Sequence, residues 1–549
     1  MAVTLFFSFL VATFVTTVLI RPLVRLAQWM HAVDLPSARK VHAAPVPRLG
    51  GLAMATGALL PLLMWATMDS QMAAFLCGVA VIVTFGVWDD LKGIDYRLKF
   101  LGQIIAVLIV VMYGEVVIRY VPFSGLDPLP DYVAIPLTVF ALVGVTNAIN
   151  LADGLDGLAG GITLLSLVSI GILAYPTEDA KVMLVTVSVI GSIVGFLRFN
   201  TYPARIFMGD GGSQFLGFSA GVLVIMLTQN SNTALSPALP LLILGLPILD
   251  TAMVMGERIY KGRSPFLPDR NHLHHKLLSV GLHHYEAVFA IYLLQTLLIA
   301  AAYSLRFEKD WLILLLYGSF CLALVVFLKV AMGAAWRVHV PPQQGSTTAD
   351  PHWIRWLRTN QRILRGAFYF AAVAIPLYFL VGALFVERVP QDIGALACAL
   401  SIVVLALYIA RRHKPFHIVE RACAYLAGIC VVYLVQVMPG PLANFSLYRN
   451  ILFGALTVAV AVGIRFSKER FRVTPTDFLV ILVALVVPNL PAINVEIGNA
   501  GLAVAMLIVL FYSIELVLNN ISRQWDVMRF TIFATLAILA FRGLTGPLA

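Results

Sequence analysis

Long apolar runs recur along the whole chain, and short polar segments separate them. Most runs approach the roughly 20 residues that a helix needs to cross the hydrocarbon core of a bilayer. The pattern predicts an all-α polytopic membrane protein with about eleven transmembrane helices in its first part and about seven in its second. The predicted spans lie near 3–20, 50–68, 72–88, 100–118, 132–149, 158–175, 182–197, 211–228, 237–257, 285–305, 311–335, 366–386, 393–410, 421–438, 450–464, 477–496, 498–517 and 530–547.

Composition supports a membrane protein over a soluble one. Of the 549 residues, 60% are apolar and 12% are charged, and the mean hydropathy is +0.90. A soluble chain is about 45–50% apolar and about 25% charged. The net charge of +10 does not indicate nucleic acid, because Lys and Arg flank the apolar runs instead of clustering on one soluble face. The five cysteines are scattered and form no C-x-x-C pair, so they indicate neither a disulfide framework nor a metal cluster.

The distribution of basic residues predicts a topology. Lys and Arg concentrate in alternate loops, which the positive-inside rule assigns to the cytoplasm, and all 11 histidines fall on the same side. No basic residue precedes the first apolar run, and Arg21 follows it, so we expect a retained first span with the N-terminus outside.

A polar stretch that contains Pro341-Pro342 divides the predicted spans into two sets. Proline, glutamine, serine and threonine gather there, which is typical of a loop. We therefore predict a first transmembrane domain over residues 1–335, a cytoplasmic linker over 336–365 and a further transmembrane module over 366–549.

Five polar segments stand out on the predicted cytoplasmic side, and no comparable segment lies on the other side. They are Lys40–Gly51, Asp89–Lys92 with Arg97, Lys99 and Gln103 after it, Asn147–Gly161, Met208–Ser213 and Asp269–Lys276. Their convergence on one side favours a common site.

Each segment taken alone has a structural explanation. The Asp89-Asp90 pair could be a solvated helix end, and Asp153 and Asp156 could cap the helix that follows them. The glycines of Gly211-Gly212 could mark a tight turn. Only their occurrence together favours a functional interpretation.

The types of residue in these segments suggest a reaction. His272, His274 and His275 have a spacing seen in metal sites, but zinc would need further Cys or His ligands, so contact with an anion is the favoured interpretation. Clustered Asp and Asn supply the hard oxygen ligands that suit magnesium. The donors for phosphate oxygens are the three histidines and Lys40, Arg48, Lys99 and Arg270. Magnesium and phosphate beside lipid imply transfer from a soluble phosphorylated donor to a lipid acceptor.

The five segments, in this order, resemble those of the polyprenyl-phosphate N-acetylhexosamine-1-phosphate transferases, which form glycosyl transferase family 4. The resemblance covers roughly residues 1–335. His272-Leu273-His274-His275 is similar to the undecaprenyl-phosphate N-acetylglucosamine-1-phosphate transferase branch, which initiates O-antigen, teichoic acid and exopolysaccharide synthesis. The sister branch, the phospho-N-acetylmuramoyl-pentapeptide transferases, usually has three consecutive histidines there.

This resemblance implies that undecaprenyl phosphate attacks the β-phosphorus of a UDP-N-acetylhexosamine and releases UMP. It implies Mg²⁺ as the cofactor, with Mn²⁺ as the alternative, and a bacterial inner-membrane enzyme whose active site faces the cytoplasm. By position in the motifs, Asp210 and Asn150 would bind the metal, and Asp89, Asp90 and Lys99 would be catalytic. The substrate-binding residues would be Asn147, Asp153 and Asp156 at the nucleotide, and Lys40, His42, Arg270, His272, His274 and His275 at the diphosphate or sugar.

Asp250 lies inside an apolar run, where ionisable groups are costly, and it resembles the family's Asp-Thr pair. For this residue the favoured interpretation is a hydrogen bond between helices without substrate contact.

Several alternatives remain open at this point. Within the family, the chain could be a phospho-N-acetylmuramoyl-pentapeptide transferase, and outside it, a polytopic transporter. Transporters place polar groups near the middle of the bilayer, whereas here they gather at one interface. The family pattern usually ends near residue 335, so we expect residues 366–549 to form a structural module or one that binds a second copy or an envelope-synthesis partner. A transporter half is the alternative, because Pro488 and Pro491 break one span.

Overall fold

A computed structural model describes residues 2–34, 45–123, 128–177, 179–231, 234–262, 264, 271–334, 361–411, 418–466, 500–520 and 525–545. These residues are helical almost throughout. The two described strands, β1 (Val33–Asp34) and β2 (Val46–Pro47), pair antiparallel with Val33 opposite Pro47. Thirteen of the described helices are long and apolar enough to cross a membrane. The expected all-α polytopic membrane protein is therefore confirmed.

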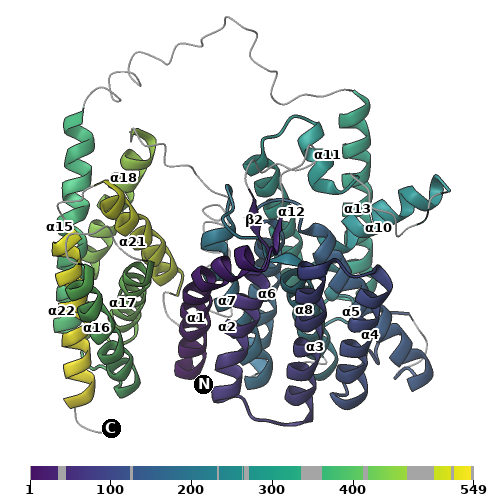
Figure 1. The fold of residues 1–549 in the computed structure, drawn as a ribbon, viewed down its shortest axis with the longest axis horizontal. Coiled ribbons are helices and arrows are strands. Elements are labelled where there is room, and N and C mark those ends of the chain that lie inside the picture. Colours follow the sequence, from purple (N-terminus) through teal and green to yellow (C-terminus); the bar gives the residue numbers. More distant parts are fainter. Residues whose placement is uncertain are drawn as a thin grey trace, which may run out of the picture. The chain divides into compact units, whose positions relative to one another are not determined.

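Contacts between helices group the described residues into two compact units, each considered by itself (Figure 1). The first unit contains α1 to α13. Its helices are α1 (Ala2–Trp29), α2 (Gly50–Trp65), α3 (Ser70–Lys92), α4 (Tyr96–Leu108, continued by a π-helical turn over Ile109–Tyr113), α5 (Asp131–Ala152), α6 (Leu158–Ala174), α7 (Ala180–Asn200), α8 (Gly209–Ile225), α9 (Pro240–Ile243), α10 (Gly245–Tyr260), α11 (Leu273–Ser279), α12 (His284–Ser304) and α13 (Asp310–Gly333).

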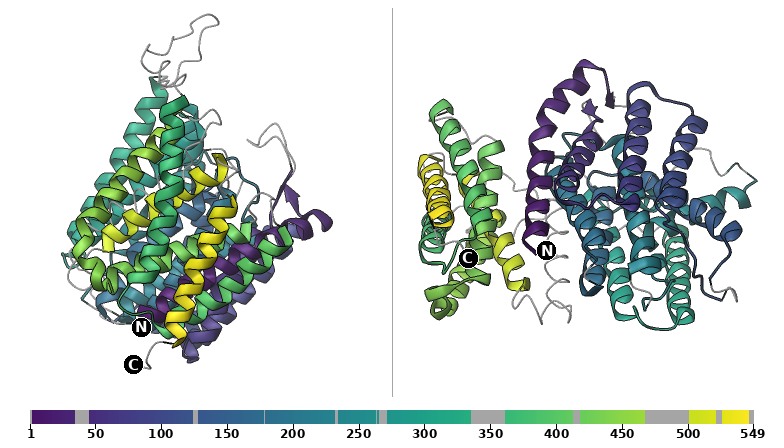
Figure 2. Two further views of the ribbon diagram at one scale, coloured as in Figure 1. Left: turned by 90° about the vertical axis from the view of Figure 1, so that its left-hand side faces the viewer. Right: turned by 90° about the horizontal axis from the view of Figure 1, so that it is seen from below.

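The second unit contains α15 to α22. Its described helices are α15 (Gln361–Phe385), α16 (Gln391–Arg411), α17 (Ile418–Val437), α18 (Ser446–Phe466), α21 (Ala500–Asn520) and α22 (Trp525–Thr545). Within this unit α22 packs along α16 and α15, as the yellow and green ribbons of Figure 2 show. The predicted span near 477–496 lies outside the described residues, as does most of the predicted linker. The predicted domain boundaries stay a prediction.

The central helix of the first unit is α8. All of its residues from Gly211 onward are buried, and α2, α3, α5 and α6 pack around it. Because every face of α8 is covered by protein, its polar side chains meet other helices and not lipid. The first turn of α8 carries Asp210. The fold thus places a carboxylate at the end of its most enclosed helix.

Glycines bring two helices very close to the start of α8. A methyl group on Gly51 of α2 would collide with the backbone of Gly212, and one on Gly86 of α3 would collide with the backbone of Gly211. Small residues at helix crossings allow such close approach and strengthen packing inside a membrane. The glycines that the sequence places around Asp210 therefore serve helix packing as well as the turn.

The predicted span near 237–257 is broken in the structure. It consists of α9 and α10, which meet at Leu244. Pro247 has no backbone N–H, so a continuous helix would lack one hydrogen bond at this point. Gln295 of α12 donates through Nε2 to the freed carbonyl of Ile243 at 2.7 Å, and Ser166 Oγ donates to the same carbonyl at 2.7 Å. Buried polar side chains from two other helices therefore stabilise the break.

Buried ion pairs hold the second unit together. Arg529 of α22 binds Glu420 of α17 through Nε at 2.8 Å, and both side chains are 1% exposed. Arg421, the next residue of α17, pairs with Glu515 of α21. Glu420, at the start of α17, is more deeply buried than Glu515, whose side chain is 18% exposed.

Candidate active site

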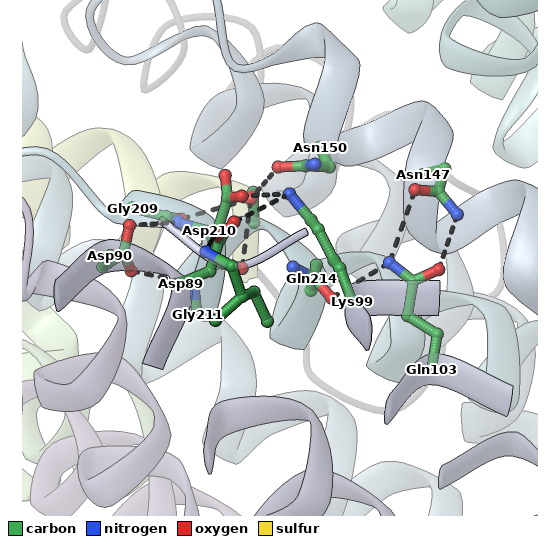
Figure 3. Close-up of polar contacts among 12 residues, drawn as sticks. Asp89, Asp90, Lys99, Gln103, Asn147, Asn150, Gly209, Asp210, Gly211 and Gln214 are labelled. Atoms are coloured by element: carbon green, nitrogen blue, oxygen red, sulfur yellow. Dashed lines mark hydrogen bonds and ion pairs between the residues drawn. The ribbon is translucent and has the colours of Figure 1, made fainter. Parts of the chain in front are cut away.

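Three charged side chains from three helices meet at the start of α8 (Figure 3). Lys99, near the start of α4, forms an ion pair with Asp210 of α8, and its Nζ lies 3.3 Å from Asp89 Oδ2 at the end of α3. A left-handed residue, Gly93 with φ of 64°, ends α3, and Ile94 N–H donates to Asp89 Oδ1 at 2.8 Å. This short turn folds α4 back along α3 and brings Lys99 to Asp89.

Asp90 has a different environment from Asp89. Its two carboxylate oxygens accept hydrogen bonds from the backbone N–H groups of Asp210 at 2.9 Å and Gly211 at 3.1 Å (Figure 3). These amides belong to the first turn of α8, where helix backbones leave donors free and where negative charge is favoured. Gly209, with φ of 66°, precedes them, and a methyl group there would collide with Asp90. The two adjacent acids therefore have different roles: Asp89 contacts Lys99, and Asp90 accepts hydrogen bonds from the backbone of α8.

Asn150 joins the cluster from the last turn of α5. In the amide orientation that gives both its nitrogen and its oxygen a hydrogen-bond partner, the nitrogen donates to Ser213 Oγ at 2.6 Å and to Asp210 Oδ1 at 3.2 Å. The amide oxygen then accepts from Lys99 Nζ at 3.3 Å. Asn150, Asp210 and Lys99 thus touch one another, as their shared motif order led us to expect.

A chain of amides continues from this cluster into the helices. Asn147 Nδ2 donates to Gln103 Oε1 at 2.7 Å, and Gln103 Nε2 donates to Gln214 Oε1 at 3.0 Å. Gln103 and Gln214 are each 1% exposed. The sequence-based site omitted Gln214, although an amide within an apolar run was a signal that could have identified it. Asn147 is oriented by this chain.

Asp153 follows α5 and lies near the cluster. Burial and the negative charges of Asp210 and Asp156 raise its pKa to about 7. Among the described residues, no hydrogen-bond donor to the Asp153 carboxylate is found. A carboxylate that lies near other acids and receives no hydrogen bond from the protein is suited to bind a cation or a hydroxyl group of a ligand.

The rest of this turn is fixed by the fold. Asp156 Oδ2 accepts from Ala204 N–H at 2.8 Å, and Tyr292 Oη donates to the Gly157 carbonyl at 2.6 Å. Helix α6 begins after Gly157 with no side-chain cap. The alternative that Asp153 and Asp156 cap α6 was therefore wrong, because Asp156 holds the loop after α7 instead.

The histidine segment is tied to α10. Asp250 accepts from Leu273 N–H at 2.6 Å, and its other oxygen lies 3.0 Å from His272 Nδ1. These contacts are the hydrogen bonds between helices that we expected of Asp250. His274 is buried, and a methyl group on Gly154 would collide with its ring, so the histidine segment also packs on the turn that contains Asp153. Burial, and secondarily the positive charge of His275, lowers the pKa of His274 to about 3.

Three of the predicted site residues, Lys40, His42 and Arg270, lie outside the described residues. Arg48, another expected phosphate donor, pairs with Asp34 of β1. The structure therefore brings together Asp89, Lys99, Asn150 and Asp210, with Asp90 and Asn147 attached to them.

The donor chemistry of this cluster fits a hard cation. Among the described residues, no group of three or more His, Cys, Asp or Glu side chains is placed to hold a metal ion. Mg²⁺ does not need such a group, because one or two carboxylates, substrate phosphates and water complete its coordination. Asp210 and Asn150 supply a carboxylate and an amide side by side. The positive charge that already lies between Asp89 and Asp210 is that of Lys99.

The chain was compared with known proteins. The sequence model described as glycosyl transferase family 4 matches residues 72–228. The chain is 36% identical to the probable undecaprenyl-phosphate N-acetylglucosaminyl 1-phosphate transferase of Bacillus subtilis over 323 residues, which are 58% of this chain and 89% of that protein. It is also 36% identical to the decaprenyl-phosphate N-acetylglucosaminephosphotransferase of Mycobacterium leprae over 306 residues, which are 49% of this chain and 75% of that protein.

A more distant relative is the undecaprenyl-phosphate alpha-N-acetylglucosaminyl 1-phosphate transferase of Escherichia coli K12. It is 28% identical over 304 residues, which cover 53% of this chain and 82% of that protein. The matched segment of the family model contains Asp89, Lys99, Asn150 and Asp210. Membership rests on the Bacillus subtilis relative, because most of that protein is covered at substantial identity. The chain belongs to glycosyl transferase family 4.

Proposed function

We propose that this protein transfers N-acetylglucosamine 1-phosphate from UDP-N-acetylglucosamine to undecaprenyl phosphate and releases UMP, which initiates a cell-envelope polysaccharide. The observation that carries the proposal is the cluster of Lys99, Asp89 and Asp210 at the end of the enclosed helix α8. A charged cluster at the end of membrane-spanning helices can bind a charged soluble donor next to a lipid acceptor that stays in the membrane. The names of the relatives support the same classes of sugar and lipid.

In the proposed reaction, an oxygen of the lipid phosphate forms a bond to the β-phosphorus of the UDP-sugar. The bond from that phosphorus to the bridging oxygen breaks, and UMP leaves with the bonding electrons. A phosphate monoester has a second pKa near 6, so the acceptor is largely ionised at neutral pH and needs little help from a base. Catalysis then depends mainly on positioning and on neutralising charge.

The described residues divide this work. Lys99 provides the ammonium group that offsets charge developing on the phosphate oxygens, and Asp89 and Asp210 hold Lys99 in place. Asp89 keeps one oxygen on Lys99 and is the member of the acidic pair that we assign to the lipid phosphate. Asp90 is a positioning residue, because both of its oxygens accept from the backbone of α8.

We also propose Mg²⁺ as the cofactor, held by Asp210 and Asn150. When bound, it would withdraw charge from the diphosphate and help to align it. The proximity of the two side chains supports this assignment, although in this structure the amide nitrogen of Asn150 faces Asp210, so the amide would have to present its oxygen to the metal.

We further propose that the site faces the cytoplasm of a bacterium whose inner membrane contains the protein. The basic residues in the loops on the side of Lys99 support this orientation. UDP-sugars are made in the cytoplasm, so a site on that side meets its donor directly.

A two-donor assay tests the proposal. Purified full-length protein in membranes with undecaprenyl phosphate receives radiolabelled UDP-N-acetylglucosamine or UDP-N-acetylmuramoyl-pentapeptide, and label in the lipid and released UMP are counted. We expect both products with the first donor only, and their loss after chelation of divalent cations. Product from the pentapeptide donor alone would assign the chain to the sister branch. A folded protein that uses neither donor would favour the transporter alternative.

A further inference from the structure

A cavity of about 520 Å³ lies between α10, α11 and α13, on the side of α11 that carries His275 and Lys276. Three lysines line it, namely Lys261 just after α10, Lys276 of α11 and Lys329 of α13. Its size falls within the range of small-molecule sites in proteins. The cluster around Lys99 does not contribute to its lining.

The charges of this cavity do not balance. Among the described residues that line it, Glu257 of α10 is the only acid, and it pairs with Lys276 at 2.6 Å. Lys276 is 6% exposed, so the fold commits a buried ammonium group to this wall. Lys261 and Lys329 add two further positive charges, and the part of the lining that the structure describes contains no second acid. An excess of ammonium donors around one space favours an anion with several acceptor oxygens, of which phosphate is the common biological example.

The cavity also lies next to surface that suits lipid. Lys329 is in the last turns of α13, a helix long and apolar enough to cross a membrane. On the same helix Phe327 is 51% and Val330 58% exposed. On the opposite wall, Tyr260 is 92% exposed at the end of α10, which projects from the edge of the first unit in Figure 1. Basic side chains next to an exposed apolar surface with an aromatic residue at its border are an arrangement that recognises anionic lipid headgroups.

We propose that this cavity binds the phosphate headgroup of an anionic membrane phospholipid, whose acyl chains lie along the exposed apolar face of α13. Lipid is favoured over soluble phosphate because the open apolar surface directly adjoins the lysines. The proposal stands apart from the transfer reaction, since no catalytic assignment depends on Lys261 or Lys329. Binding here would stabilise the contacts between α10, α11 and α13.

Native mass spectrometry of the full chain in mild detergent tests the proposal, with phosphatidylglycerol as the probe. We expect a retained phosphatidylglycerol adduct and a higher unfolding temperature with added lipid. Lys261→Gln combined with Lys329→Gln should weaken this binding by roughly tenfold or more, because each lysine near a lipid phosphate contributes about 1 kcal/mol. Lys309→Gln, an exposed lysine at the other end of α13, is the matched control and should bind as the unaltered protein does.

Circular dichroism and gel filtration establish that the variants fold. If the double variant does not fold, Lys329→Gln alone replaces it, with a several-fold loss of binding expected because Lys329 is exposed. Equal retention of phosphatidylglycerol by a folded lysine variant and by Lys309→Gln would overturn the proposal.

Competition experiments distinguish a phospholipid headgroup from other phosphate-containing ligands of the cavity. Millimolar inorganic phosphate should not displace phosphatidylglycerol, and phosphatidylcholine should bind much more weakly. Displacement by inorganic phosphate would make this a soluble-anion site, and displacement by undecaprenyl phosphate at equal concentration would make it an acceptor site. Either result would overturn the phospholipid assignment, as would equal binding of phosphatidylcholine.

Discussion

Each unit of the protein places acids and bases together among its helices, but the two arrangements differ in exposure. In the second unit, Arg529 makes two hydrogen bonds to Glu420 and a further contact with Asp526 at 3.3 Å, and the side chains of Arg529 and Glu420 are both 1% exposed. In the first unit, Lys99 faces both Asp89 and Asp210, and the side chain of Asp210 is 32% exposed.

This difference separates a structural pair from a candidate site. A pair that is closed off from solvent cannot be reached by a ligand, and its main effect is on packing. A charged cluster that solvent reaches can still accept a cation, or a phosphate group bound to that cation. Access to solvent is therefore what distinguishes the candidate site from the structural pair here.

The largest effect is expected for Asp210→Asn. The change keeps the volume of the side chain and removes the charge that holds Lys99 and the proposed metal, so UMP release should fall by at least about a thousandfold. Circular dichroism should show a folded protein. Near-normal UMP release at saturating magnesium would remove Asp210 from the site.

For the buried pair of Arg529 and Glu420, we expect a loss of stability and not of activity. Arg529→Met deprives the buried Glu420 of its arginine and should cost about 3–5 kcal/mol of stability. Adding Glu420→Leu should recover most of this loss, because a neutral apolar pair needs no compensation. Thermal unfolding followed by circular dichroism measures both variants. A double variant as unstable as Arg529→Met would contradict the comparison.

Substitutions of the two adjacent acids, Asp89 and Asp90, should have different effects on the kinetics. Asp89→Asn should lower kcat by about a hundredfold with little change in KM for the UDP-sugar, as expected for a group that acts in the transition state. Asp90→Asn should instead lower the unfolding temperature, because asparagine has only one oxygen to accept the two N–H groups that Asp90 binds at the start of α8. Identical kinetic and thermal profiles for the two variants would contradict the division of roles.

A smaller effect should appear in the pH dependence of stability. An unfolded histidine has a pKa near 6.5, whereas burial lowers that of His274 to about 3. Between these values the unfolded chain binds the extra proton, so His274 makes the protein less stable as pH falls, by up to about 1.4 kcal/mol per pH unit. Asp153, whose pKa is raised, acts in the opposite direction over part of this range.

Comparison with His274→Gln isolates the contribution of this histidine. The slope of unfolding temperature against pH should be shallower in His274→Gln than in the unaltered protein. His31→Asn, at an exposed histidine, is the control and should keep the original slope. An unchanged slope in His274→Gln would show that the proton is taken up elsewhere.

The smallest effect is expected when the second unit is removed. A chain that ends between Val340 and Asp350 keeps every residue assigned to the transfer site, so we expect it to insert and to release UMP at a rate close to that of the full chain. Cysteine accessibility measures insertion. Normal insertion without UMP release would show that the second unit contributes to catalysis.

The sequence predicted the presence of the membrane-spanning helices better than the residues at which they begin, break and end. Apolar runs of sufficient length predict spans, because a bilayer requires every backbone group to be paired within the helix. The break at Leu244 was not foreseen, since its stability depends on Gln295 and Ser166, which are distant in sequence. Likewise, Asp89 and Asp90 lie in the last turn of α3 and Asp210 in the first turn of α8, although the spans predicted near 72–88 and 211–228 stop short of these residues.

Motif order foretold that Asp89, Lys99, Asn150 and Asp210 would gather, but not what each would contact. The cap that Asp90 provides for α8 joins residues about 120 positions apart, and pattern alone does not reveal such a partner. The same holds for Glu420, whose acidity at the edge of an apolar run gave no sign of Arg529.

The break between α9 and α10 also has an order of assembly during synthesis. The carbonyl of Ile243 receives hydrogen bonds from Ser166, which is made earlier, and from Gln295, which is made about fifty residues later. An unpaired polar group in hydrocarbon costs several kcal/mol, and the hydroxyl of Ser166 is available to pair this carbonyl while α12 is still being made. The break can therefore form before α12 is complete, and Gln295 then adds the second hydrogen bond that fixes it.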